Sequence, residues 1–96
     1  MCVVIEFDSA KDEANRIKHG VALAFGLRVF EDGAHIVLPS SRPIDGEDRY
    51  KAVGTVEGRL WTVVHVWRGE TLRLISVRRS NAGEQRDYDR DPEGSE

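Results

Sequence analysis

Arginine gives this sequence its clearest capacity for chemistry, because five arginines lie in one short stretch with a single acid. Residues 59–79 read RLWTVVHVWRGETLRLISVRR. The five are Arg59, Arg68, Arg73, Arg78 and Arg79. A guanidinium is planar, permanently charged and able to bind phosphate or carboxylate with two parallel hydrogen bonds, so the stretch predicts an anion-binding surface. The alternative is that these arginines lie at strand ends and sheet edges, where they keep a β-protein soluble.

Three other side chains could transfer protons near neutral pH: His19, Glu47 and His65. Histidine titrates close to neutrality without special tuning, and a carboxylate can serve as a base or acid where its surroundings suit. Each has a structural alternative. His19 could simply end a helix, Glu47 could pair with Arg49 for ~0–1 kcal/mol, and His65 lies between two valines and could be packed.

The stretch that carries the five arginines is predicted to be a β-hairpin. Two runs rich in Val, Ile, Thr and Trp, 60–67 and 72–77, favour strands, and the glycine between them supplies the positive φ of a tight turn. With a two-residue loop, Arg68 and Arg73 share one face of the hairpin and Arg78 lies on the other. A three-residue loop would change the register and regroup them.

A first helix is predicted after a short strand at residues 3–7, with Asp8 or Ser9 as its N-cap and Gly20 after its last residue. Its apolar residues recur at helical spacing and predict the face that packs on a sheet: Ala10, Ala14 and Ile17. A second stripe at the same spacing is polar and basic: Lys11, Asn15 and Lys18. Spacing alone favours a solvated flank for this second stripe, with its last basic residues stabilised at the negative end of the helix dipole.

The remaining elements predict an α+β fold. The apolar segment 21–30 predicts a second, largely buried helix softened at Gly26, and strands are expected at 34–38 and 49–56. A turn at Glu57-Gly58 leads into the hairpin. We therefore expect an antiparallel meander sheet with two N-terminal helices packed on one face.

Length and charge predict one domain at residues 1–83, followed by an acidic tail. Residues 1–83 contain 12 Lys/Arg and 11 Asp/Glu, whereas residues 84–96 contain two Arg and six acids. We expect the tail to be frayed, with a short helix around residues 84–88. The net charge of −3 does not exclude a nucleic-acid partner, because the basic residues are concentrated in the hairpin.

The sequence lacks the motifs that are typical of several functional classes. It has no P-loop, dinucleotide fingerprint or hydrolase elbow, so we expect no cofactor, and Cys2 and the three histidines lack the spacing of metal ligands. No stretch approaches the ~18 apolar residues of a membrane span, and no signal-peptide pattern is present. With a single cysteine the expected location is the cytoplasm.

Motifs spread over residues 6–80 resemble the BrnT family, the toxins of bacterial type II toxin–antitoxin pairs. The segment FDSAK…N…KHGV at 7–21 resembles the opening of that family, and VFED at 29–32 and GEDR at 46–49 follow in the family's order. RLISVR at 73–78 is similar to the family's RIISAR. The resemblance implies a RelE-like fold and an endoribonuclease that acts on RNA without a metal. A cognate antitoxin would neutralise it, and DNA would be contacted only through that antitoxin.

The resemblance also assigns site residues. Metal-free RNA cleavage needs a base for the 2′-OH, cations that stabilise the phosphorane, and an acid for the leaving 5′-oxygen. The expected catalytic residues are Lys11, His19, Glu47, Arg49, Arg68 and Arg78, and the expected RNA-binding residues are Lys18, Arg73 and Arg79. Arg78 is expected to lie nearest the scissile phosphate. The runner-up function is a catalytically weak partner-binding module that acts with a DNA-binding antitoxin in autorepression.

Overall fold

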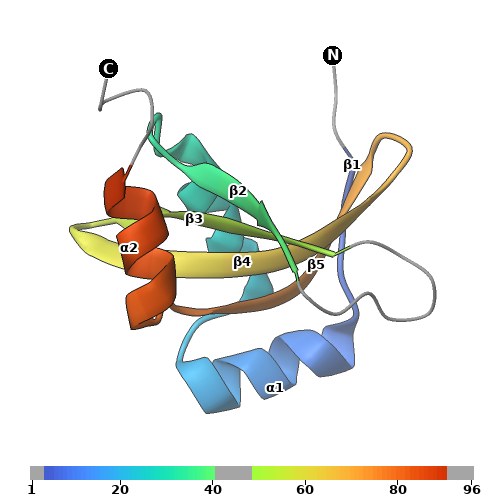
Figure 1. The fold of residues 1–96 in the computed structure, drawn as a ribbon. Helices are drawn as coiled ribbons and strands as arrows, with labels where there is room; N and C mark the ends of the chain where they lie inside the picture. Colours follow the sequence, from blue (N-terminus) through green and yellow to red (C-terminus); the bar gives the residue numbers. More distant parts are fainter. Residues whose placement is uncertain (1–3, 41–48, 91–96) are drawn as a thin grey trace.

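The computed structural model describes residues 4–40 and 49–90. Glu47, one of the expected catalytic residues, lies outside them. In chain order the elements are β1 (Val4–Glu6), α1 (Ser9–His19), the 3₁₀ helix η1 (Leu23–Glu31), β2 (Ile36–Pro39), β3 (Tyr50–Val56), β4 (Arg59–Arg68), β5 (Thr71–Arg79) and α2 (Ala82–Arg90) (Figure 1). No helix in these two segments is long and apolar enough to cross a membrane.

The described strands form one sheet in the order β1-β5-β4-β3-β2. Strands β2 to β5 are an antiparallel meander, as the sequence predicts. Strand β1 joins β5 in parallel, so the sheet as a whole is mixed. The sequence prediction was therefore incomplete, because a parallel partner so far along the chain leaves no local turn signal.

The β4–β5 hairpin has a two-residue loop, one of the two alternatives that the sequence left open, since Arg68 faces Thr71. Gly69 has φ 62°, so the predicted positive φ in the turn is confirmed. The predicted facing of Arg78 is wrong, however. The pairing shifts at Val64/His65, where β5 carries one extra residue between the two that face them. This bulge reverses the alternation beyond it, so Arg78 faces Thr62 and shares a face with Arg73.

The core lies between the sheet and η1, which covers the face that carries Trp61, Val63 and Val77. Leu23 and Val29 of η1 are fully buried, so the predicted burial of this segment is confirmed, although it forms a 3₁₀ rather than an α-helix. A Cβ at Gly26 would lie 2.9 Å from a methyl of Val77. Glycine at this position therefore allows η1 to approach the sheet.

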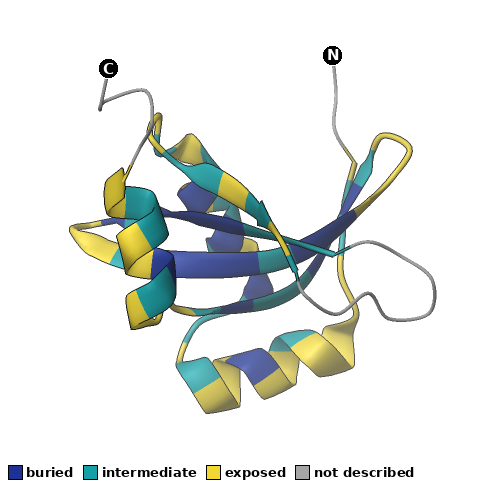
Figure 2. Ribbon diagram, viewed as in Figure 1, coloured by how far each residue is buried: buried dark blue, intermediate teal, exposed yellow. Residues whose placement is uncertain are grey.

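Helix α1 lies along the edge of β5 that β4 does not occupy (Figure 1). The sequence prediction of its buried face was wrong: Ile17 is 79% exposed and Asn15 only 5% exposed. Figure 2 shows the helix as mostly exposed, with one buried band and intermediate bands on either side of it. The reason is that a sheet edge offers unpaired backbone groups, which an amide side chain satisfies and an apolar side chain does not.

Helix α2 lies on the face of the sheet opposite η1 (Figure 1). It includes the short helix expected at residues 84–88, and it shows that residues 84–90 of the acidic segment are helical. Residues 91–96 lie outside the described part of the chain. The division into a domain at 1–83 and a tail stays a prediction.

Candidate functional site

Asn15 fixes α1 against β5 and in this way determines the geometry of the site. Its Nδ2 donates to the backbone oxygens of Val77 and Val21, both at 2.9 Å. The Val77 N–H donates to Asn15 Oδ1 at 3.0 Å. The side chain thus pairs with both backbone groups of one β5 residue, as a neighbouring strand would, and also holds the link between α1 and η1.

Because Asn15 faces β5, the residues one helical turn to either side of it do so as well. Lys11 precedes it by four residues and Lys18 follows it by three, which places all three on one side of the helix. Both lysines line a pocket of about 180 Å³ between α1 and β5. Its remaining lining residues are Ala14, Asn15, His19, Ile75 and Ser76. The pocket is therefore cationic and has polar groups on its floor.

His19 is the group in this pocket whose side chain ordinarily titrates near neutral pH. Partial burial lowers its pKa below 6.5, and the charges of Lys18 and Arg78 lower it further. The neutral imidazole is thus favoured at neutral pH. Its ring makes no hydrogen bond with any residue in the described segments, so its nitrogens are available to a ligand. Arg78 lies two residues after Ser76 of the pocket lining, on the same face of β5.

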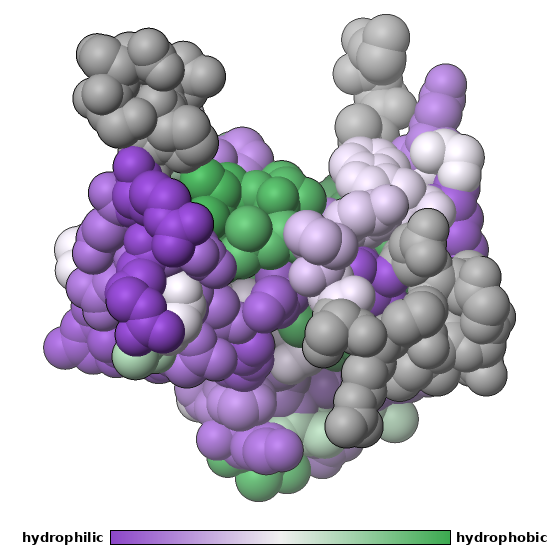
Figure 3. All heavy atoms as spheres, in the orientation of Figure 1, coloured by the Kyte–Doolittle hydropathy of each residue, from purple (hydrophilic) through white to green (hydrophobic). Residues whose placement is uncertain are grey.

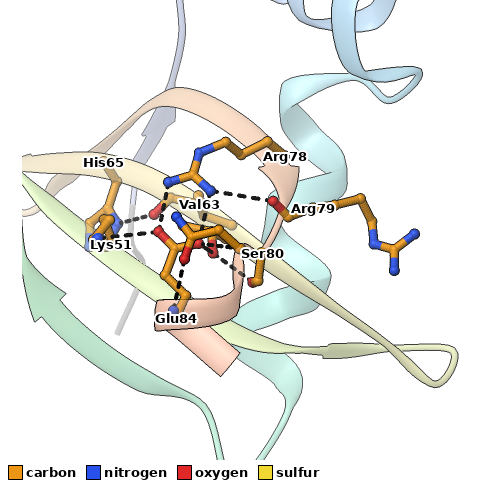
Figure 4. A network of polar contacts seen from close by, with 9 residues as sticks. Lys51, Val63, His65, Arg78, Arg79, Ser80 and Glu84 are labelled. Atoms are coloured by element: carbon orange, nitrogen blue, oxygen red, sulfur yellow. Dashed lines mark hydrogen bonds and ion pairs between the residues drawn. The ribbon is translucent and has the colours of Figure 1, made fainter. Parts of the chain in front are cut away.

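Arg78 is held on its other side by Glu84 of α2 (Figure 4). Its Nη1 and Nη2 donate to the two carboxylate oxygens of Glu84 at 2.8 and 2.7 Å. Lys51 Nζ lies 3.2 Å from Glu84 Oε2, and the Thr62 hydroxyl donates to Oε1 at 2.9 Å. An Arg78→Ala variant is therefore expected to lose stability as well as any activity, because it leaves a buried carboxylate short of a partner.

Glu84 is charged despite its burial. Its side chain is only 2% exposed. Burial alone would raise the pKa of Glu84, but hydrogen bonds from Arg78, the Asn81 backbone, Thr62 and Lys51 outweigh burial and lower the pKa to about 2. Asp32, which directly follows η1, accepts a hydrogen bond at 2.7 Å from the hydroxyl of Tyr88, near the C-terminal end of α2. Burial would likewise raise the Asp32 pKa, but hydrogen bonds from Thr55, Tyr88 and Ala34 lower it to about 2.

These two carboxylates predict a loss of stability in acid. A carboxylate whose folded pKa is depressed stabilises the protein above its unfolded pKa, and that contribution disappears as the pH falls towards the folded value. For Glu84 the window runs from 4.5 down to about 2, and the contribution is on the order of 2–3 kcal/mol. Comparing the free energy of unfolding in urea at pH 7 and at pH 3 measures the part of this contribution that is lost between the two pH values. Glu84→Gln is expected to lose less stability over this interval than the parent; equal losses would contradict the assignment.

The four other arginines of the expected site lie outside the pocket between α1 and β5. Arg73 Nη1 pairs with Glu6 Oε2 at 2.6 Å, and Arg68 lies 3.9 Å from the same oxygen. Arg79 lies 5.6 Å from the ring centroid of Trp61, on the face that η1 covers. Arg49 precedes β3, and its backbone oxygen accepts from Ser40 at 2.7 Å. The pocket beside α1 thus brings together Lys11, Lys18 and His19, and Arg78 lies two residues along β5 from the lining residue Ser76.

His65 is 1% exposed and packs edge-on against Phe30, with ring centroids 5.2 Å apart. Burial lowers its pKa, with a smaller contribution from His35, while a hydrogen bond to the Val63 backbone raises it. This agrees with the packed interpretation. Within residues 4–40 and 49–90, no group of three His, Cys, Asp or Glu side chains could hold a metal ion.

Sequence reasoning missed Lys51, Thr62 and Glu84. A local signal for Glu84 exists in the pattern Asn81-x-x-Glu84. The Glu84 N–H donates to Asn81 Oδ1 at 2.8 Å, and the Asn81 N–H donates to Glu84 Oε1 at 3.0 Å. This reciprocal capping box marks the start of a helix. Nothing local links Lys51 to it, because their contact depends on the sheet.

The fold and site define a small α+β protein with a cationic, histidine-containing pocket between helix α1 and strand β5. Residues 7–84 match the family described as ribonuclease toxin, BrnT, of type II toxin–antitoxin system. The match covers most of the chain, so the chain belongs to this family, and the resemblance found in its motifs is confirmed. No match was found among curated proteins. The described site residues all lie within the matched region, which ends at Glu84.

Proposed function

We propose that this protein is an endoribonuclease toxin that cleaves RNA without a metal ion and that a cognate antitoxin neutralises it. Membership of a ribonuclease toxin family supports the class of reaction. The observation that carries the assignment to this pocket is His19, a histidine of lowered pKa that lies among cations. A neutral imidazole beside positive charge is suited to remove a proton next to a phosphodiester.

In the proposed mechanism, His19 removes the proton from the ribose 2′-OH, and the resulting oxygen attacks the adjacent phosphorus. The bond to the 5′-oxygen breaks, so the products are a 2′,3′-cyclic phosphate and a 5′-hydroxyl. Lys11, Lys18 and Arg78 stabilise the charge that develops on the phosphorane. A lysine ammonium in the same pocket donates the proton that the leaving 5′-oxygen requires.

The finer features of the family resemblance belong to the same proposal. The meander sheet with η1 on one face is compatible with a RelE-like fold. Function in the cytoplasm, and contact with DNA only through the antitoxin, follow from the role of a type II toxin rather than from any described contact.

The test is incubation of the purified protein with single-stranded RNA in the presence and absence of EDTA. Cleavage that survives EDTA and leaves 2′,3′-cyclic phosphate ends is the expected result. Cleavage that occurs only with an added divalent metal would contradict the mechanism. If the purified protein does not cleave RNA but binds a DNA-binding antitoxin, the catalytically weak partner-binding module is the better description. The 79% exposure of Ile17 on α1 favours that second function, because exposed apolar side chains can dock a partner.

The two lysines of the pocket predict an effect on RNA binding. Lys18→Ala is expected to weaken binding about 5–10-fold at low salt and to reduce the salt dependence by roughly one phosphate contact. Arg16→Ala is the matched control, because Arg16 lies on the same helix but is 60% exposed and only 3.9 Å from Asp12, outside the pocket lining. Fluorescence anisotropy with a labelled RNA measures both. Equal weakening in the two variants would indicate general electrostatics rather than this pocket.

A further inference from the structure

Glu84 occupies a set of donors that belong to three neighbouring strands. Lys51 comes from β3, Thr62 from β4 and Arg78 from β5, and Thr62 and Arg78 face each other directly. Together they bind both carboxylate oxygens at 2.7–3.2 Å. A guanidinium that binds in a bidentate manner, an ammonium and a hydroxyl are also donors that can bind a phosphate group. The carboxylate of Glu84 can therefore stand where two phosphate oxygens would lie.

The helix that supplies this carboxylate makes few of the contacts that usually hold a helix to a sheet. Glu84 is its only buried residue, and no apolar side chain of α2 is buried. Figure 3 shows hydrophilic atoms over α2 beside a hydrophobic patch over β2. Two cavities flank the helix: one of about 440 Å³ between α2 and Ile36–Leu38, and one of about 240 Å³ beside Tyr88. Among the described residues, α2 is anchored apart from the Glu84 contacts by the hydrogen bond from the Tyr88 hydroxyl to Asp32.

Removing α2 would thus uncover little apolar surface on the helix itself. The main loss would be the ion pairs and hydrogen bonds of Glu84, and an incoming phosphate could replace these with the same donors. Hydrophobic burial, which normally makes helix detachment costly, opposes this exchange only weakly. Helix α2 can therefore detach from the sheet with little loss of buried apolar surface on the helix.

The covered donors also adjoin the pocket described above. Arg78 binds Glu84 and lies on the same face of β5 as Ser76, two residues away, which lines the pocket. Without the carboxylate, the positive surface would extend from Lys11 and Lys18 through Arg78 to Lys51.

We propose that Lys51, Thr62 and Arg78 form a binding site for a backbone phosphate of RNA, which Glu84 of α2 occupies until RNA displaces the helix. The site would hold a phosphate next to the one that is cleaved. The proposal rests on the proposed function for its ligand class, RNA, but not for the chemistry of cleavage.

The first test compares Glu84→Gln with Asp87→Asn, two variants of α2 that each remove one negative charge. Asp87 is the control because it lies 3.8 Å from Arg90 and outside the Glu84 network. Binding of a non-cleavable RNA with 2′-deoxy sugars is measured at low salt. Glu84→Gln is expected to bind at least tenfold more tightly than the parent, and Asp87→Asn within about twofold of it. Equal affinities for the two variants would overturn the proposal.

The second test uses the unaltered protein, so it does not depend on whether the Gln variant folds. Amide hydrogen exchange is measured with and without the same RNA. Amides of residues 85–90 are expected to exchange at least tenfold faster when RNA is bound, while those of β4 do not. Unchanged or slower exchange in α2 would overturn the proposal. Because both tests measure binding alone, a protein that passes them but does not cleave RNA would contradict the proposed function and leave this site intact.

Discussion

Replacing His19 by alanine is expected to lower RNA cleavage on the order of 10²-fold or more, the usual contribution of a positioned general base. His19 lies in the α1–β5 pocket, its pKa is lowered by burial and by the charges of Lys18 and Arg78, and its ring donates no hydrogen bond within the described segments. The substitution should therefore change the free energy of unfolding by less than about 0.5 kcal/mol, as at other surface positions. Single-turnover cleavage of a labelled RNA measures the first effect, and urea unfolding measures the second.

His35→Ala is the control for this prediction. The His35 ring lies 2.8 Å from the Asp32 backbone oxygen and packs on Phe30, so this variant can lose stability but should keep the cleavage rate of its folded fraction. The pH profile gives an independent check. Because the base must be neutral, cleavage should rise as His19 deprotonates, with a midpoint below pH 6.5. Lys18→Ala removes one of the charges that depress this pKa, so the midpoint should move to higher pH. A profile that does not move would show that another group is the base.

The sequence predicted the meander and its hairpin well because their signals are local. Alternating β-branched runs and turn residues such as Gly69 set strand positions over a few residues. It did not predict the parallel pairing of β1 with β5, which joins residues that are far apart in the chain. Nor did it predict the bulge at Ile75, which reverses the facing of Arg78. Bulges depend on how neighbouring strands fit, so an alternation pattern cannot locate them.

The site was also predicted only in part, because its geometry depends on how the elements pack and not on local signals alone. Helical spacing put Lys11 and Lys18 on one stripe, but spacing does not tell which stripe faces the protein. The apolar stripe with Ile17 looked like the inner face, but Ile17 is exposed and the residue of α1 that is buried is Asn15, from the polar stripe. The difference depends on the partner: α1 packs against backbone groups at a sheet edge, so a hydrogen-bonding residue at its centre is favoured over an apolar one.

Asn15→Ala is consequently expected to destabilise the protein by ~3 kcal/mol, which for a domain of this size lowers the melting temperature by roughly 12–24 °C. The variant leaves the N–H and C=O of Val77 without their partners, frees the Val21 oxygen and opens a cavity under α1. Ile17→Ala is the matched control, because it removes a larger side chain from the same helix at a position that is 79% exposed, and it should change stability by less than about 0.5 kcal/mol. Thermal and urea unfolding compare the two. Similar stabilities would show that Asn15 does not anchor the helix; a large difference, with weaker RNA binding by the folded Asn15 variant, would show that this amide positions Lys11, Lys18 and His19 against β5.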